Sequence, residues 1–185
     1  MTKVSMPSAH SCLPQEGHLK AAHQMFECTK SHPNLTAVFD SKLPHIDRAK
    51  FKSADWTDVH GDIKESKPCK MPPPRGNPVE ISMFVDATHA GDLINCRSET
   101  GVMMFVNSAP VTWHGKRQGT AEASAFGSEF SVLCIGMEMN EGLQHKLQMM
   151  GVSVGGLSNM HCNCQSVVDN STLPESQLKK KRLST

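Results

Sequence analysis

The apolar residues of this chain are unevenly distributed, and this distribution limits where a hydrophobic core can form. Of the 37 Leu, Ile, Val and Phe residues in the 185-residue chain, 22 lie between Val79 and Val168. Because a domain folds by burying such side chains in one core, we expect the packed domain over residues 79–178. Residues 1–40 then form a leader, residues 41–78 a linker, and residues 179–185 a basic tail.

The composition argues against several classes of protein. The 19 basic and 18 acidic residues leave a net charge of +1, unlike histone-like proteins that bind nucleic acid through many Lys and Arg side chains. No run reaches the 18 or so apolar residues of a membrane span, and the N-terminus lacks an apolar signal segment. Seven cysteines in a chain of this length do not suggest a disulfide framework. We therefore expect an intracellular protein, cytoplasmic or nuclear, that is not secreted and has no membrane partner.

The leader and the linker have different local patterns. Apolar residues at helical spacing predict an amphipathic helix over Glu16–Lys30, followed by a short strand over Thr36–Asp40. The linker carries six prolines and ends in the stretch MPPPRGNP, which is incompatible with a helix or a central strand. The linker is therefore expected to be a loop.

The first half of the domain predicts three strands. Apolar and polar residues alternate over Ile81–Val85, which predicts a strand that ends at Asp86. The apolar run Gly101–Asn107 and the segment Val111–Lys116 are separated by a short turn. Three sequential strands with short connections predict an antiparallel meander.

The second half predicts two helices and a fourth strand. Apolar residues recur at spacings of three and four over Glu122–Met150, which predicts one long helix stopped by Gly151. Leu157–Cys162 predicts a strand, and Gln165–Asn170 predicts the start of a short helix. The resulting fold class is mixed α/β, with helices packed on one sheet.

This order of elements brings three polar residues into comparable positions. Asp86 follows the first strand, Glu129 lies in the first turns of the long helix, and Asn163 follows the fourth strand. If the first and fourth strands are neighbours, the three side chains converge at one end of the sheet. Converging carboxylates repel unless a cation lies among them, and hard divalent ions in such clusters hydrolyse phosphodiester bonds.

Two shorter motifs could also hold a metal. They are Asp58, His60 and Asp62 in the linker, and His161, Cys162 and Cys164 near the fourth strand. The first lacks the glycine and glutamate of a calcium loop, which favours a solvated loop. The second has zinc-type ligands but no second ligand pair, and successive strand residues point to opposite faces, which favours cysteines packed as small apolar side chains.

Several longer blocks resemble, in order, the ribonuclease H domain in the polyprotein of copia-type LTR retrotransposons. Residues 16–34 in addition resemble the end of the preceding reverse transcriptase region. The blocks are FVDATHAGD (84–92), RSETG (97–101), APVTWHGKRQGTAE (109–122), SAFGSEF (124–130) and CNCQSVV (162–168).

The resemblance implies a ribonuclease H-like fold and an enzyme that cuts the RNA strand of an RNA:DNA hybrid with two Mg²⁺ or Mn²⁺ ions. Asp86 and Glu129 match two of the family's catalytic, metal-binding acids. The third acidic position falls on Asn163, so a carboxylate is missing. The family continues past the end of this chain with a strand, a helix and a fourth acid, so the expected domain is incomplete at its C-terminus.

These departures predict an inactive or strongly impaired nuclease, because two carboxylates bring two negative charges against the four positive charges of two ions. Asp169 is too far along its helix to replace the missing acid. The remaining alternatives are a non-catalytic module that binds nucleic acid or protein, and an element remnant without function.

The resemblance also suggests binding partners. Lys116 and Arg117 are candidate phosphate contacts for the hybrid, with a solvated hairpin end as the alternative. The remainder of a reverse transcriptase polyprotein is a second candidate partner. The terminal KKKR, residues 179–182, fits a frayed terminus better than a nucleic-acid patch.

Overall fold

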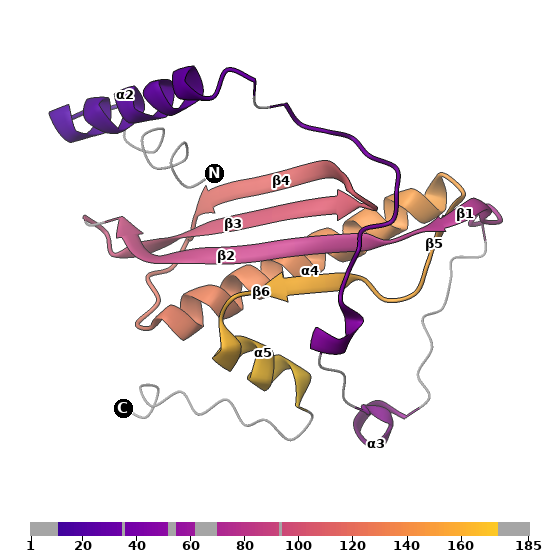
Figure 1. The fold of residues 1–185 in the computed structure, drawn as a ribbon. Helices are drawn as coiled ribbons and strands as arrows, with labels where there is room; N and C mark the ends of the chain where they lie inside the picture. Colours follow the sequence, from indigo (N-terminus) through magenta and orange to yellow (C-terminus); the bar gives the residue numbers. More distant parts are fainter. Residues whose placement is uncertain (1–10, 35, 52–54, 62–69, 93, 174–185) are drawn as a thin grey trace.

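The computed structural model describes residues 11–34, 36–51, 55–61, 70–92 and 94–173. It is a mixed α/β structure in which a long helix crosses one face of a four-stranded sheet (Figure 1). Residues 174–178 of the expected domain and the basic tail lie outside the described residues. The expectation of a multi-stranded sheet with helices packed on it is confirmed.

The four-stranded sheet has the order β4-β3-β2-β6. The first three strands form the expected antiparallel meander, and β6 pairs in parallel with β2 on its other side. The first and fourth predicted strands are therefore neighbours. The strands are β2 (Ile81–Asp92), β3 (Arg97–Val106), β4 (Ala109–Arg117) and β6 (Asn159–Cys162).

Strand β2 is longer than its sequence pattern indicates. Asp86 does not end the strand; it pairs with Gly101 in the middle of the ladder, which continues past a bulge to Asp92 opposite Arg97. The prediction of a strand ending at Asp86 was therefore wrong. The residues after Asp86 show no alternation, but β3 pairs with Ala87, Thr88 and, beyond the bulge, Asp92, and so extends the strand.

The long helix α4 (Ala125–Met149) packs on β2 and β3. It begins where the Ser124 side chain accepts a hydrogen bond from the Gly127 amide, and it ends before Gly151, whose φ of +74° fits the expected glycine stop. Its apolar face covers a core formed with alternate residues of β2 and β3. The buried apolar residues are Ile81, Met83, Val85, Val102, Met104, Val132, Leu133, Leu147 and Val167.

A second, two-stranded sheet lies beside the first. Strand β1 (Arg75–Val79) pairs in parallel with β5 (Val152–Val154). The proline-rich linker therefore ends in a strand, which the sequence pattern did not predict. Pro78 is compatible with it because β1 has a partner on one side only.

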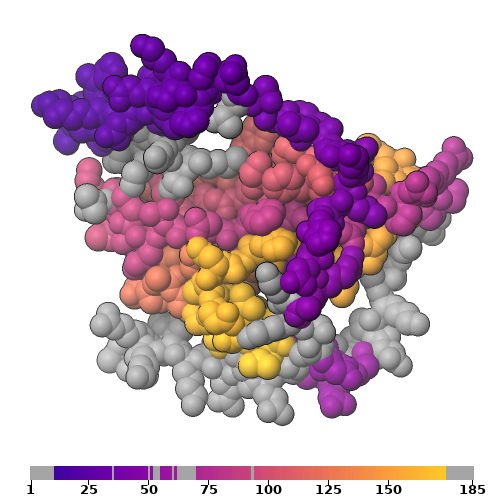
Figure 2. Space-filling model, viewed as in Figure 1, coloured from indigo at the N-terminus to yellow at the C-terminus, as the bar shows by residue number. Residues whose placement is uncertain are grey.

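The leader contains the expected helix, α2 (Glu16–Ser31), but none of its residues is buried. The strand predicted over Thr36–Asp40 is absent, since no neighbouring strand pairs with it, and Val38 and Phe39 are exposed. The chain instead crosses the sheet face opposite α4 (Figure 2). There the Asn107 side chain and the Ser108 amide donate hydrogen bonds to the carbonyls of residues 41 and 42.

Three short helices complete the described structure. A single 3₁₀ turn, η1 (Arg48–Lys50), follows the crossing segment, and Arg48 forms an ion pair with Glu80. The helix α3 (Thr57–His60) occupies part of the expected linker loop. The helix α5 (Gln165–Thr172) follows β6 close to the predicted position.

Candidate functional site

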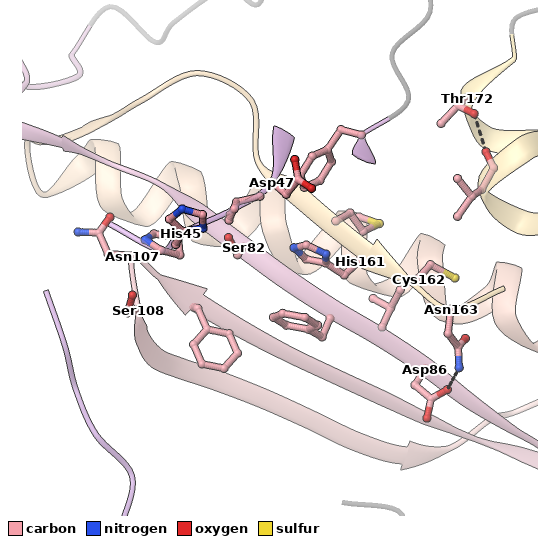
Figure 3. A pocket seen from close by; sticks show the side chains of 18 of the residues that line it. His45, Asp47, Ser82, Asp86, Asn107, Ser108, His161, Cys162, Asn163 and Thr172 are labelled. Atoms are coloured by element: carbon pink, nitrogen blue, oxygen red, sulfur yellow. Dashed lines mark hydrogen bonds between the residues drawn. The ribbon is translucent and has the colours of Figure 1, made fainter. Parts of the chain in front are cut away.

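The structure brings Asp86, Glu129 and Asn163 together at one place on the sheet. The parallel pairing of Val85 with Cys162 brings the next residues of β2 and of the loop after β6 side by side. There the Nδ2 atom of Asn163 donates a hydrogen bond of 3.2 Å to Oδ1 of Asp86 (Figure 3). Glu129 approaches from the second turn of α4, close enough to accept a hydrogen bond from the Ala87 amide and for the charge of Asp86 to raise its pKa.

Glu129 is the buried member of the three residues, with 8% of its surface exposed. Burial raises the pKa of its carboxyl group, the backbone amide of Ala87 opposes this by donating a hydrogen bond, and the nearby charge of Asp86 raises it further. Its Oε2 atom is buried and has no hydrogen-bond partner among the described residues. The ionised carboxylate is therefore incompletely compensated, which is the environment that a cation would relieve.

Cys162 lies close to both carboxylates. Burial raises the pKa of its thiol, and the charges of Glu129 and Asp86 raise it further. A raised thiol pKa keeps the sulfur protonated at neutral pH, and a protonated thiol is a poor metal ligand. Cys162 therefore contributes an apolar wall to the site, consistent with its packing against the core.

His161 points to the other face of the sheet from Cys162. Its ring stacks on Phe84 with centroids 4.5 Å apart, and burial lowers its pKa. Within the described residues, no group of three His, Cys, Asp or Glu side chains is arranged to hold a metal. The side chains of His161 and Cys162 lie on opposite faces of the sheet and do not converge on one position. Of the linker motif, Asp62 lies outside the described residues.

The donor set of the site fits one hard divalent cation better than two. Asp86 is exposed and Glu129 offers an unpartnered buried oxygen, and carboxylate oxygens are the ligands that Mg²⁺ and Mn²⁺ prefer. Asn163 turns its NH₂ group, a hydrogen-bond donor, toward Asp86. This amide occupies one of the positions at which the Asp86 carboxylate can accept a hydrogen bond or bind a cation. It also adds no negative charge that could hold a second ion.

Asp86 and Asn163 lie at one end of a groove of about 1050 Å³ on the sheet face opposite α4, whereas Glu129, on α4, is not among its lining residues (Figure 3). Its floor is aromatic, with Phe84 between Phe105 and His161. Two acidic residues, Asp47 and Asp86, line the groove, and none of its lining residues is Lys or Arg. The groove itself is therefore unsuited to phosphate groups.

The two predicted phosphate contacts have different environments. Lys116 is exposed on β4, and the register aligns it through Thr100 with Ala87, one residue from Asp86. The guanidinium of Arg117 instead donates a hydrogen bond of 2.7 Å to the buried carboxylate of Asp92. Arg117 is thus engaged within the protein, whereas Lys116 faces solvent.

Asp92 is held in its ionised form by several donors. A hydrogen bond from the Asn95 side chain lowers its pKa most, followed by that from Arg117 and by backbone amides of the following turn, and these outweigh the effect of burial. This cluster fixes the turn between β2 and β3, so its role is structural.

A buried polar network that the sequence pattern did not indicate lies beside Glu129. The Oγ atom of Ser128 lies 2.8 Å from Nδ1 of His89 and 2.7 Å from Oγ of Ser98, and the Gln118 side chain donates a 3.0 Å hydrogen bond to the Ser128 carbonyl. The only local signal was the position of Ser128 directly before Glu129. Asp169 accepts a hydrogen bond from Gln165 on its own helix.

Comparison with known proteins gives no relative for this arrangement. The chain matches no family model, no curated protein and no solved structure. Among the described residues, no helix is both long and apolar enough to cross a membrane.

Proposed function

We propose that this chain is a ribonuclease H-like domain that binds RNA:DNA hybrids and keeps one weak divalent-cation position, with cleavage strongly impaired by Asn163. The observation that carries the proposal is the convergence of Asp86, Glu129 and Asn163 from β2, α4 and the loop after β6. Support also comes from the topology, because the first four sequence blocks fall on three antiparallel strands and the long helix. The last block, residues 162–168, begins at the end of β6, which is parallel to β2, and continues into α5.

The roles of the residues follow from their environments. A hard divalent ion held by Asp86 and Glu129 would act as a Lewis acid on a phosphodiester oxygen. Asp86 is exposed and can contact solvent or substrate, whereas Glu129 is buried and has one unpartnered oxygen. Asn163 adds no charge and donates one hydrogen bond to Asp86, so it offers a second ion no further carboxylate ligand.

The surface beside the site determines where a hybrid would lie. The groove is lined by acidic and aromatic residues, so its walls repel phosphates. Lys116 is exposed two strands away from β2, about 10 Å at the usual strand spacing. We therefore place the phosphate backbone of the hybrid across β4 and the start of α4, outside the groove.

The experiment that tests the proposal measures cleavage of a labelled RNA:DNA hybrid in Mg²⁺ and in Mn²⁺. The proteins are the unmodified chain, Asn163→Asp, and Asn163→Asp combined with Glu129→Gln as the control for contaminating nuclease. We expect Asn163→Asp to cleave faster than the unmodified chain by a factor on the order of 100 or more, because several kcal/mol of transition-state stabilisation return with the carboxylate. The double variant should be inactive.

A stability measurement supplies a readout independent of cleavage. Without metal, Asn163→Asp replaces a hydrogen bond with two like charges, which should lower the free energy of unfolding by about 1 kcal/mol at an exposed site. Mg²⁺ at ten times its Kd should restore about 1.4 kcal/mol, while the unmodified chain responds less. If Asn163→Asp neither cleaves nor gains stability from Mg²⁺, the proposal is wrong, and retained hybrid binding would then indicate a non-catalytic module.

A further inference from the structure

The structure contains a buried polar network at the first turns of α4 that the site's own chemistry does not use. It joins residues from β2, β3, the segment between β4 and α4, and α4 around one hydroxyl group, that of Ser128. Ser98 and Ser128 are fully buried, and Gln118 has 6% of its surface exposed. The members are His89, Ala90, Ser98, Gln118, Ser124 and Ser128.

The hydrogen bonds of this network form a continuous chain across the sheet. The Ala90 amide donates to Oγ of Ser98 over 3.1 Å, and the Ser98 and Ser128 hydroxyls lie 2.7 Å apart. Ser128 then reaches Nδ1 of His89 at 2.8 Å or the Ser124 carbonyl at 3.3 Å. Each hydroxyl therefore has both a donor and an acceptor, whereas Oε1 of Gln118 is buried and has no hydrogen-bond partner among the described residues.

The network also holds the backbone on which Glu129 sits. The Gln118 side chain donates to the Ser128 carbonyl, and the Gln118 amide donates to the Ser98 carbonyl over 2.8 Å. Ser128 is thus attached to the sheet through its side chain and through its main chain. Because Glu129 is the next residue, these attachments determine where its carboxylate lies.

Glu129 needs such support. Its carboxylate is buried, has an oxygen without a hydrogen-bond partner in the described structure, and lies near the like charge of Asp86. Both effects favour a movement of the first turns of α4 that would expose the carboxylate to water. A residue that resists this movement keeps the carboxylate of Glu129 in place. Holding it there lowers the stability of the fold, and the other hydrogen bonds of the network must offset this loss.

We propose that Ser128, anchored by Ser98 and Gln118, is a positioning residue that holds Glu129 beside Asp86 for cation binding. This inference rests on the proposed function, because it explains how the carboxylate of Glu129 is held near that of Asp86. It predicts that breaking the network weakens cation affinity beyond its effect on folding.

The test measures Mn²⁺ affinity by electron paramagnetic resonance in the Asn163→Asp chain, well below its melting temperature. Ser128→Ala and His89→Ala each remove one end of the central hydrogen bond, and His89 is exposed, so its variant is expected to fold. Ser131→Ala, on the same helix and outside the network, is the matched control. We expect Ser128→Ala to weaken Mn²⁺ binding by about 10-fold, or about 1.4 kcal/mol, His89→Ala by less, and the control to have no effect.

The outcomes separate this inference from the proposed function. If the parent chain binds no Mn²⁺, or binds it equally well after Glu129→Gln, the proposed function fails and the inference fails with it. If the parent binds through Glu129 but Ser128→Ala and His89→Ala both keep full affinity, only the positioning role is overturned. If Ser128→Ala does not fold, His89→Ala decides between these results.

Discussion

The contact between α4 and β2 at Gly136 predicts a difference between two chemically identical substitutions. A Cβ atom at Gly136 would lie 2.8 Å from Cγ1 of Val85 and 3.1 Å from Sδ of Met83. The first distance is about 0.7–1.2 Å shorter than the separation at which carbon atoms rest. Met83 can adapt, but Val85 is stiff and has 3% of its surface exposed, so it has no space into which to move.

The expected magnitude follows from two opposing effects. Replacing glycine by alanine in a helix interior stabilises the folded protein by about 0.8–1 kcal/mol, and overpacking a core costs about 1–3 kcal/mol. Gly136→Ala should therefore lower the free energy of unfolding by about 0–2 kcal/mol. Gly142→Ala is the matched control on the same helix, because a Cβ there meets no atom within 4 Å, and it should raise stability by about 0.5–1 kcal/mol.

Urea unfolding followed by circular dichroism measures both variants. The result that supports the packing is a Gly136→Ala protein about 1–3 kcal/mol less stable than Gly142→Ala, with unchanged m-values. Equal stabilisation by both substitutions would refute the reasoning, since it would show that α4 does not lie against Val85. Gly136 is seven residues from Glu129 on the same face of α4, so lifting the helix there should also weaken Mn²⁺ binding in the Asn163→Asp chain.

Three further predictions concern charged residues. Lys116→Ala should weaken hybrid binding and reduce the slope of log affinity against log salt concentration by about 1, measured by anisotropy titrations from 50 to 200 mM salt. Arg117→Ala should instead lower the stability of the protein. An equal loss of hybrid affinity in both variants would contradict this assignment. Because the pKa of Glu129 is raised on folding, stability should fall as pH rises from its unfolded pKa toward its folded pKa, and unfolding measured from pH 4 to 8 should show a smaller decline for Glu129→Gln. The pKa of Asp92 is lowered in the folded protein, so the ionised carboxylate stabilises the fold above the ordinary Asp pKa near 4, and this stabilisation is lost as pH falls below that value. In Asp92→Asn the free energy of unfolding should therefore depend less on pH between pH 2 and 5. An unchanged pH dependence over this range would exclude the role of Asp92.

The sequence predicted the elements whose pattern is local. The alternation over Ile81–Val85 and the helical spacing over Glu122–Met150 reflect the two sides of one core, because each buries its apolar residues against the other. The same reasoning brought Asp86, Glu129 and Asn163 to one place once β6 paired beside β2. The local pattern of apolar residues was sufficient to predict these elements, because the position of a residue in a strand or helix determines which way its side chain points.

The features that the sequence did not predict depend on partners distant in the chain. Strand β1 contains a proline and a glycine, and β5 has three residues, so neither has a recognisable pattern before the two pair. The extension of β2 past Asp86 likewise depends on β3. Ser98 and Ser128 read as ordinary polar residues, and only their mutual contact at 2.7 Å makes them a buried network.

Under the proposed function, Asn163 changes the balance between stability and chemistry at this site. An aspartate there would bring the number of carboxylates at the site to three, with those of Asp86 and Glu129, and such a cluster needs cations to offset its repulsion. The asparagine amide instead donates a hydrogen bond to Asp86, so the protein without metal no longer depends on an ion. The same exchange removes the charge that would hold a second ion, and stability is gained where activity is lost. The buried Glu129 remains uncompensated by this exchange, which is why the network around Ser128 should matter most when the carboxylate at position 163 is restored.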